Sequence, residues 1–329
     1  MPNQVVRVFA PQPVTMRVAV DAFLAVCRAK NLSPNTTAYY SYRLRAFMQF
    51  LDAQGMAPSA EEVTPTIIRD FLTHEREANS AVTACHAYVT LSAFYNHLLR
   101  DGVIDSSPME KVQKPKRPQR IIPTFDRTQI ERLFAVMNGR DFLDTRDRAI
   151  LITLLDTGIR ASELTNLTVA DIGLESNQLR VIGKGDKERI VPFSPQASSG
   201  MLAYFLLRNQ LIDNYREPDL NAPFFVTSLG DPMDRHALRS MLMSRGKRAG
   251  IKGVRVSPHT MRHTAAVSFL RGGGDAFRLQ KLLGHSDLTM TRKYCELNDD
   301  DLREAYRHCS PLEALVGRGA VPGRRKRIR

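Results

Sequence analysis

The sequence predicts a mainly α-helical protein of two domains, the second of which adds a small antiparallel sheet to its helices. Ser33-Pro34 and Thr64-Pro65 are both typical helix starts, and apolar residues recur at helical spacing after each. Further along, two β-prone runs flank a Gly-rich turn within 177–193, which predicts a hairpin. Between the two regions, residues 106–123 combine four prolines with many basic side chains and predict a basic linker.

The first region is expected to be helical from residue 15 to 105, after a proline-rich arm at 1–14. Its predicted helices cover about 15–29, a stretch from Pro34 that ends at Gly55, a stretch from Pro65, and about 81–100. In the last of these, an apolar stripe of Leu91, Phe94, Tyr95 and Leu98 predicts a buried face.

The second region, 124–310, is expected to mix helices with the hairpin, before a basic tail at 311–329. A break at Asp156-Thr157-Gly158 separates one helix from a short one that follows. The predicted helices cover about 128–137, 146–155, 161–166, 199–213, 235–249, 259–271, 277–283, 289–294 and 301–305.

The charge balance favours a polyanion as partner. Lys and Arg number 47 against 34 Asp and Glu, a formal charge of +13, which makes nucleic acid the first class to consider. The four cysteines form no CxxC pair, and we expect neither a metal nor another cofactor. No segment is typical of a signal peptide or a membrane span, so a cytoplasmic protein is expected.

Five short segments follow one another in the second region: TGIRASEL (157–164), IGKGDKERIVPF (182–193), SPHTMRHT (257–264), LLGHSDL (282–288) and TRKYCEL (291–297). Each is common by itself, but in this order and spacing the chain resembles the tyrosine recombinase family, the phage-type integrases. The resemblance covers 124–310, which would be the catalytic domain. It extends more loosely to 15–105, which would be the DNA-clamping, core-binding domain.

Arg160 and Arg262 are the candidates for gripping the scissile phosphate. Phosphodiester cleavage places negative charge on the phosphate oxygens, and a planar guanidinium can hold two of them. Arg262 follows His259 by three residues, so both side chains lie on one helical face. Taken singly, either arginine would be an ordinary surface charge; the resemblance assigns them to the phosphate.

Tyr294 is the nucleophile that the resemblance implies. A phenol with a pKa near ~10 needs assistance from cations and a base at neutral pH. His259 is the candidate proton acceptor, and His285 the candidate donor to a phosphate oxygen. Outside this set, Tyr294 would be an ordinary half-buried tyrosine and each histidine a structural residue.

Lys184, in the predicted hairpin turn, is the candidate general acid, because the departing 5′-oxygen needs a proton. Lys187 and Arg189 lie on the same hairpin and are assigned to phosphate contacts. Glu163, three residues after Arg160, is expected to orient an arginine, with a plain surface carboxylate as the alternative. Further DNA contacts are expected in the linker, from Lys111, Lys114, Lys116 and Arg117.

The resemblance implies cleavage and rejoining of double-stranded DNA at a specific site through a 3′-phosphotyrosyl intermediate, without ATP. It also implies a tetramer on two DNA sites, with protomers that exchange the segment after Tyr294. The short arm before Thr15 favours a recombinase of the Xer-like or mobile-element type. The alternatives are a type IB topoisomerase, a DNA-binding protein without catalysis, and a metal-dependent carboxylate transposase, which EDTA would inhibit.

Overall fold

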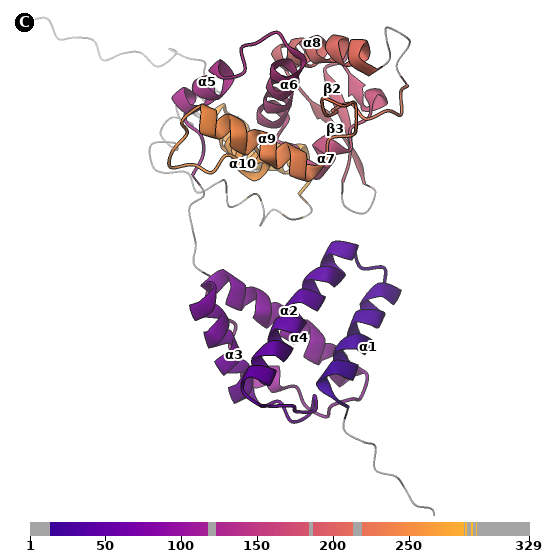
Figure 1. The fold of residues 1–329 in the computed structure, drawn as a ribbon, viewed down its shortest axis with the longest axis vertical. Coiled ribbons are helices and arrows are strands. Elements are labelled where there is room, and N and C mark those ends of the chain that lie inside the picture. Colours follow the sequence, from indigo (N-terminus) through magenta and orange to yellow (C-terminus); the bar gives the residue numbers. More distant parts are fainter. Residues whose placement is uncertain are drawn as a thin grey trace, which may run out of the picture. The chain divides into compact units, whose positions relative to one another are not determined.

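The structure is a computed structural model that describes residues 14–117, 123–183, 187–212, 219–285, 287, 291 and 294. It confirms the mainly helical fold class with a small antiparallel sheet. The chain divides into two compact units, 1–120 and 121–329, and each is described by itself (Figure 1). None of the helices in the described part of the chain has the length and apolar character needed to cross a membrane.

The first unit contains four α-helices, and two of them begin where the capping signals predicted. The side chains of Ser33 and Thr64 each accept a hydrogen bond from a backbone N–H of the first turn, and proline occupies the first helical position in both cases. Gly55, just beyond the second helix, has the left-handed φ of 67° that a glycine tolerates. The four helices are α1 (Met16–Ala29), α2 (Pro34–Ala53), α3 (Pro65–Ala78) and α4 (Ala81–Arg100).

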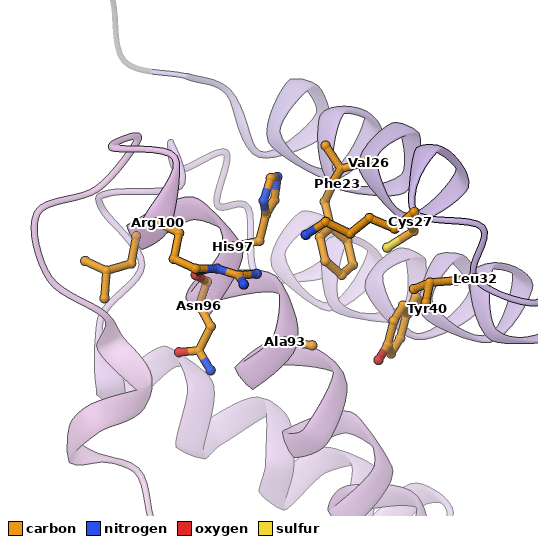
Figure 2. A pocket seen from close by; sticks show the side chains of 11 residues that line it. Phe23, Val26, Cys27, Leu32, Tyr40, Ala93, Asn96, His97 and Arg100 are labelled. Atoms are coloured by element: carbon orange, nitrogen blue, oxygen red, sulfur yellow. Dashed lines mark hydrogen bonds between the residues drawn. The ribbon is translucent and has the colours of Figure 1, made fainter.

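The core of this unit lies where α4 packs against the other three helices. The predicted stripe on α4, Leu91, Phe94, Tyr95 and Leu98, is buried. A hollow opens where α1, α2 and α4 meet, with the Phe23 ring on its wall and Arg100 at its edge (Figure 2).

The first part of segment 106–123 packs onto this unit. It begins with a 3-10 turn, η1 (Pro108–Lys111), and Met109 and Val112 are buried in the core of the unit. The Cys85 thiol donates to the Pro115 carbonyl at 3.1 Å. The apolar side chains that are interspersed with its basic residues account for this packing, which a count of prolines and charges does not reveal.

The second unit surrounds α6, which packs against α8 and α10 at the centre of a large apolar core. Three antiparallel strands lie in the order β1-β2-β3, with Val181 of β2 opposite Arg189 of β3. The elements are α5 (Arg127–Ala135), α6 (Phe142–Thr157), α7 (Ala161–Thr165), η2 (Val169–Asp171), β1 (Ile172–Gly173), β2 (Gln178–Ile182), β3 (Glu188–Pro192), α8 (Pro195–Ile212), α9 (Arg235–Arg248), α10 (Pro258–Arg271) and α11 (Ala276–Leu283).

Three predicted boundaries in this unit were wrong. Helix α6 begins at Phe142 because the Asp141 side chain caps it, and it continues to Thr157, so only Gly158 is the break. Helix α8 begins at Pro195, where the Ser194 hydroxyl accepts from the Ala197 N–H at 3.2 Å. The two-residue strand β1 was not predicted, because so short a run has no alternation to detect. The predicted helix 301–305, and most of 289–294, lie outside the described residues.

Candidate active site

Arg160 is held at the start of α7 by Glu163. Helix α6 ends at Gly158 in the left-handed conformation, and two residues later Arg160 occupies the N-cap of α7. The Arg160 backbone N–H donates to Glu163 Oε2 at 2.8 Å, and its Nη1 donates to Oε1 at 2.7 Å. The Arg160 side chain remains 36% exposed, so the guanidinium is oriented but still accessible.

Arg262 projects from the first turns of α10 into the interior of the unit. Ser257 caps this helix and Pro258 is its first residue. Arg262 Nη1 donates to the Gly158 carbonyl at 2.6 Å, and Nη2 donates to the Leu283 carbonyl at 2.8 Å. Burial, followed by the nearby charge of Arg160, lowers the pKa of Arg262 to about 10, so the group still carries its charge at neutral pH.

Three successive carbonyls at the C-terminal end of α11 accept hydrogen bonds from three arginines. Arg189 Nε donates to the carbonyl of Leu282 at 3.2 Å, Arg262 to that of Leu283, and Arg160 Nη2 to that of Gly284 at 3.2 Å. A helix C-terminus leaves these carbonyls without helical partners and carries partial negative charge. The end of α11 therefore binds three cationic side chains that lie far apart in the sequence.

Glu163 joins two of these arginines. Its Oε1 accepts from both Arg160 Nη1 and Arg189 Nη1, and its Oε2 accepts from Arg189 Nη2 at 2.9 Å. Burial alone would raise the pKa of this carboxyl, but the hydrogen bonds from Arg189 and Arg160 outweigh burial and lower it to about 2. Glu163 is therefore ionised at neutral pH, and it accepts hydrogen bonds from two of the three arginines.

His285 and Tyr294 lie beside Arg262. Arg262 Nη2 lies 2.9 Å from His285 Nε2, and since a guanidinium only donates, Nε2 accepts. His285 Nδ1 then carries the proton and donates to Thr291 Oγ1 at 3.0 Å. The Tyr294 ring stacks with that of His285, and the two ring centroids lie 6.2 Å apart.

His263 is a neighbour of Tyr294 that the sequence reasoning missed. It is buried, and its ring centroid lies 5.0 Å from that of Tyr294. The signal was its position four residues after His259, on the same face of α10. His259 itself is exposed in the first turn of α10.

The remaining predicted residues divide between the two units. Lys184 lies outside the described residues, and Lys187, three residues later, is exposed. Arg189, for which a phosphate contact was predicted, is mostly buried against Glu163 and α11. Lys111, Lys114, Lys116 and Arg117 are exposed in the first unit. Within the described ranges, no group of three or more His, Cys, Asp or Glu side chains could hold a metal ion.

Comparison with known proteins decides the family. Residues 123–301 match the model of the phage integrase family, and residues 20–105 match the phage integrase N-terminal SAM-like domain. The chain belongs to the phage integrase family of tyrosine recombinases. The chain is 36% identical to tyrosine recombinase XerC of Pelobacter propionicus, covering 86% of this chain and 91% of that protein. It is 33% identical to tyrosine recombinase XerD of Lacticaseibacillus casei, covering 86% and 94%.

Solved recombinase structures share the fold. The XerH site-specific recombinase in a post-cleavage complex with its palindromic difH substrate aligns with a TM-score of 0.70 at 18% identity, covering 87% of this chain and 83% of that one. A lambda integrase dimer bound to a COC′ core site aligns with a TM-score of 0.68 at 17% identity, covering 85% and 95%. This tyrosine recombinase is thus an enzyme of site-specific recombination that breaks and rejoins DNA strands.

Proposed function

We propose that this recombinase cleaves DNA by attack of Tyr294 on a phosphate that Arg160 and Arg262 bind. The observation that carries the proposal is the convergence of both arginines and His285 at the end of α11, with the Tyr294 ring stacked on His285. These side chains come from four separate segments of the sequence, which only the fold brings together.

The charge of this cluster suits a phosphodiester. Among the described residues, Glu163 accepts from Arg160 and Arg189, whereas Arg262 donates to uncharged carbonyls and to a histidine. The surplus positive charge is available for the negative charge that develops on the phosphate oxygens during attack. Arg160, the more exposed of the two gripping arginines, is the first that an incoming phosphate reaches.

The bond changes balance without a metal or ATP. The Tyr294 oxygen forms a bond to phosphorus while the bond from phosphorus to the 5′-oxygen breaks, leaving a 3′-phosphotyrosyl link and a 5′-hydroxyl. The phenol proton passes to a histidine of α10, His259 in our assignment. Lys184 donates a proton to the 5′-oxygen, and the 5′-hydroxyl of another strand reverses the reaction. His285 becomes a donor to the phosphate when Nε2 takes up a proton.

The first unit offers a basic and aromatic surface for the duplex. Arg43, which pairs with Glu75 at 3.2 Å, lies over the rings of Tyr39 and Tyr42, at 5.8 and 5.2 Å from their centroids. The Tyr39 ring meets His86, whose pKa is lowered by burial and then by the charges of Arg43 and Arg117. With the exposed lysines of 111–116, this surface suits phosphates and bases.

We further propose a tetramer on two DNA sites, with exchange of the segment after Tyr294. Lambda integrase has been solved as a tetramer bound to a Holliday junction, on the same fold. The segment that would be exchanged lies outside the described residues.

A nicked suicide duplex carrying the recombination site tests the nucleophile. The wild-type protein should form a covalent protein–DNA adduct in the presence of EDTA, and Tyr294→Phe should form none. The matched control is Tyr88→Phe, which removes the same hydroxyl from a half-buried ring of α4 and should leave the adduct intact. An adduct that persists in Tyr294→Phe would falsify the assignment, and loss of the adduct in EDTA would favour a metal-dependent enzyme.

A second assay separates recombination from simple relaxation. Two plasmid sites should exchange flanking DNA in the wild-type protein, whereas a type IB topoisomerase would only relax supercoils. Relaxation without any recombinant product would contradict the tetramer.

A further inference from the structure

We propose that Arg189 is a positioning residue that keeps Arg160 available to the scissile phosphate by sharing the Glu163 carboxylate and anchoring the end of α11. The inference rests on the proposed function, because it concerns the phosphate that Arg160 is proposed to bind. It gives Arg189 a role different from the direct phosphate contact that the sequence suggested.

The contacts of Arg189 are directed inward. Its two terminal nitrogens each lie 2.9 Å from an oxygen of Glu163, the parallel geometry that a guanidinium and a carboxylate form best. Its third nitrogen, Nε, donates to the Leu282 carbonyl. The side chain is only 15% exposed, compared with 36% for Arg160.

Charge explains why this pairing matters to Arg160. Glu163 Oε1 accepts from Arg160 and Arg189 together, so neither arginine has the carboxylate to itself. If Arg189 were neutral, Glu163 and Arg160 would form a balanced ion pair, and Arg160 would bind a phosphate less strongly. With Arg189 charged, the trio retains the positive charge that the reaction uses.

Geometry adds a second effect. A Cβ on Gly284 would lie 2.9 Å from Arg189 Cζ, so the absence of a side chain at residue 284 lets the guanidinium approach the end of α11. The Gly284 carbonyl accepts from Arg160. Two groups orient Arg160, the Glu163 carboxylate and the Gly284 carbonyl. Arg189 holds the first directly, and it holds the end of α11, which carries the second, through the Leu282 carbonyl. Since Arg189 belongs to β3, it also ties the hairpin that carries Lys184 to this site.

The test compares Arg189→Gln with Arg180→Gln in single-turnover adduct formation. Arg180 lies on the neighbouring strand β2, is 44% exposed and pairs with Asp171 at 2.8 Å, so it matches Arg189 in residue type and hairpin but not in contact with Glu163. One suicide duplex carries the ordinary scissile phosphodiester. The other carries a methylphosphonate there, which is uncharged and needs less cationic stabilisation.

We expect Arg189→Gln to cleave the ordinary phosphodiester about 100-fold more slowly than wild type, as misplacement of a binding group does. On the methylphosphonate the loss should be much smaller, while Arg180→Gln should match wild type on both duplexes. Equal losses on the two duplexes, or no loss on the phosphodiester, would overturn the proposal. Thermal unfolding of each variant shows whether a loss reflects folding, which would affect both duplexes alike.

A double-mutant cycle with Glu163→Gln separates positioning from direct contact. If Arg189 acts through Glu163, the double variant should be no slower than the slower single variant, because the two changes remove one interaction. If Arg189 bound the phosphate itself, the two losses would multiply, and our proposal would be wrong.

The result that would refute Tyr294 as the nucleophile differs from the result that would refute the role of Arg189. An adduct that survives Tyr294→Phe in the wild-type background refutes the nucleophile, whatever Arg189 does. A wild-type adduct that depends on Tyr294, together with an unaffected Arg189→Gln, refutes only the role of Arg189.

Discussion

Two arginine clusters in the second unit differ in how the charge of their side chains is balanced. In the first cluster, Arg146 and Arg245 both pair with Asp147 at 2.7 Å, and Arg245 also pairs with Asp144 at 2.7 Å. All four side chains are at most 14% exposed, and their charges balance.

In the second cluster, Arg160 and Arg189 share the Glu163 carboxylate, and Arg262 donates to two carbonyls and to a histidine. Carbonyl oxygens orient a guanidinium without cancelling its charge. The balanced cluster of Arg146 and Arg245 has no net charge with which to bind an anion. The unbalanced cluster of Arg160, Arg189 and Arg262 retains positive charge beside Tyr294. The number of carboxylates around the arginines, more than their burial, distinguishes the two.

The largest effect on stability is expected in the balanced cluster. Asp147→Ala leaves two buried arginines without their shared partner and should lower the free energy of unfolding by about 3–5 kcal/mol. Urea denaturation followed by circular dichroism measures this, and adduct formation per folded molecule should stay near the wild-type rate. The control Glu131→Ala breaks the exposed pair with Arg127 and should cost at most about 1 kcal/mol. Equal effects of the two variants would mean that the buried network adds nothing.

The largest effect on activity is expected in the unbalanced cluster. Arg160→Gln removes a charged donor and should slow adduct formation by about 10²–10³-fold, with a smaller loss of stability than in Asp147→Ala. Single-turnover cleavage of the suicide duplex measures the rate, and Arg127→Gln, an exposed arginine of α5, is the matched control. A variant that cleaved normally but unfolded easily would place Arg160 with the structural arginines.

A smaller effect should appear in the pH dependence of stability. The pKa of Glu163 is about 2 in the folded protein against an ordinary value of 4.5, so its contribution is present above pH 4.5 and is lost as the pH falls toward 2. Between pH 6 and pH 3 the wild-type protein should lose about 2 kcal/mol more than Glu163→Gln does. Denaturation at the two pH values measures the difference, and parallel losses in both proteins would show that the carboxylate is not held by the arginines.

The sequence predicted the helices best where capping and periodicity agreed. Helix α4 has the predicted bounds, 81–100, and the predicted buried stripe, because its ends and its apolar face are local signals. The packing of Met109 and Val112 was missed, because it depends on a groove made by helices earlier in the chain.

The order and spacing of the motifs made Arg160, Arg262, His285 and Tyr294 candidate site residues, but they did not predict how these side chains are held. The bidentate pair of Arg189 with Glu163 spans 26 residues, and the carbonyls of Leu282 and Leu283 carry no residue-specific signal, since every residue has one. Likewise His263 lies next to Tyr294 only because α10 and the end of α11 form one small core with that ring.

The three carbonyls at the end of α11 make part of this active site invisible to side-chain mutagenesis. Replacing Leu282 or Leu283 with another apolar residue would leave the acceptor atoms for Arg189 and Arg262 in place. These side chains can therefore change while the hydrogen bonds to the arginines persist. Alanine substitution at either position would report only the loss of apolar packing. Replacing the backbone amide after each carbonyl with an ester, which weakens the oxygen as an acceptor, would show how much these arginines depend on the polypeptide backbone itself.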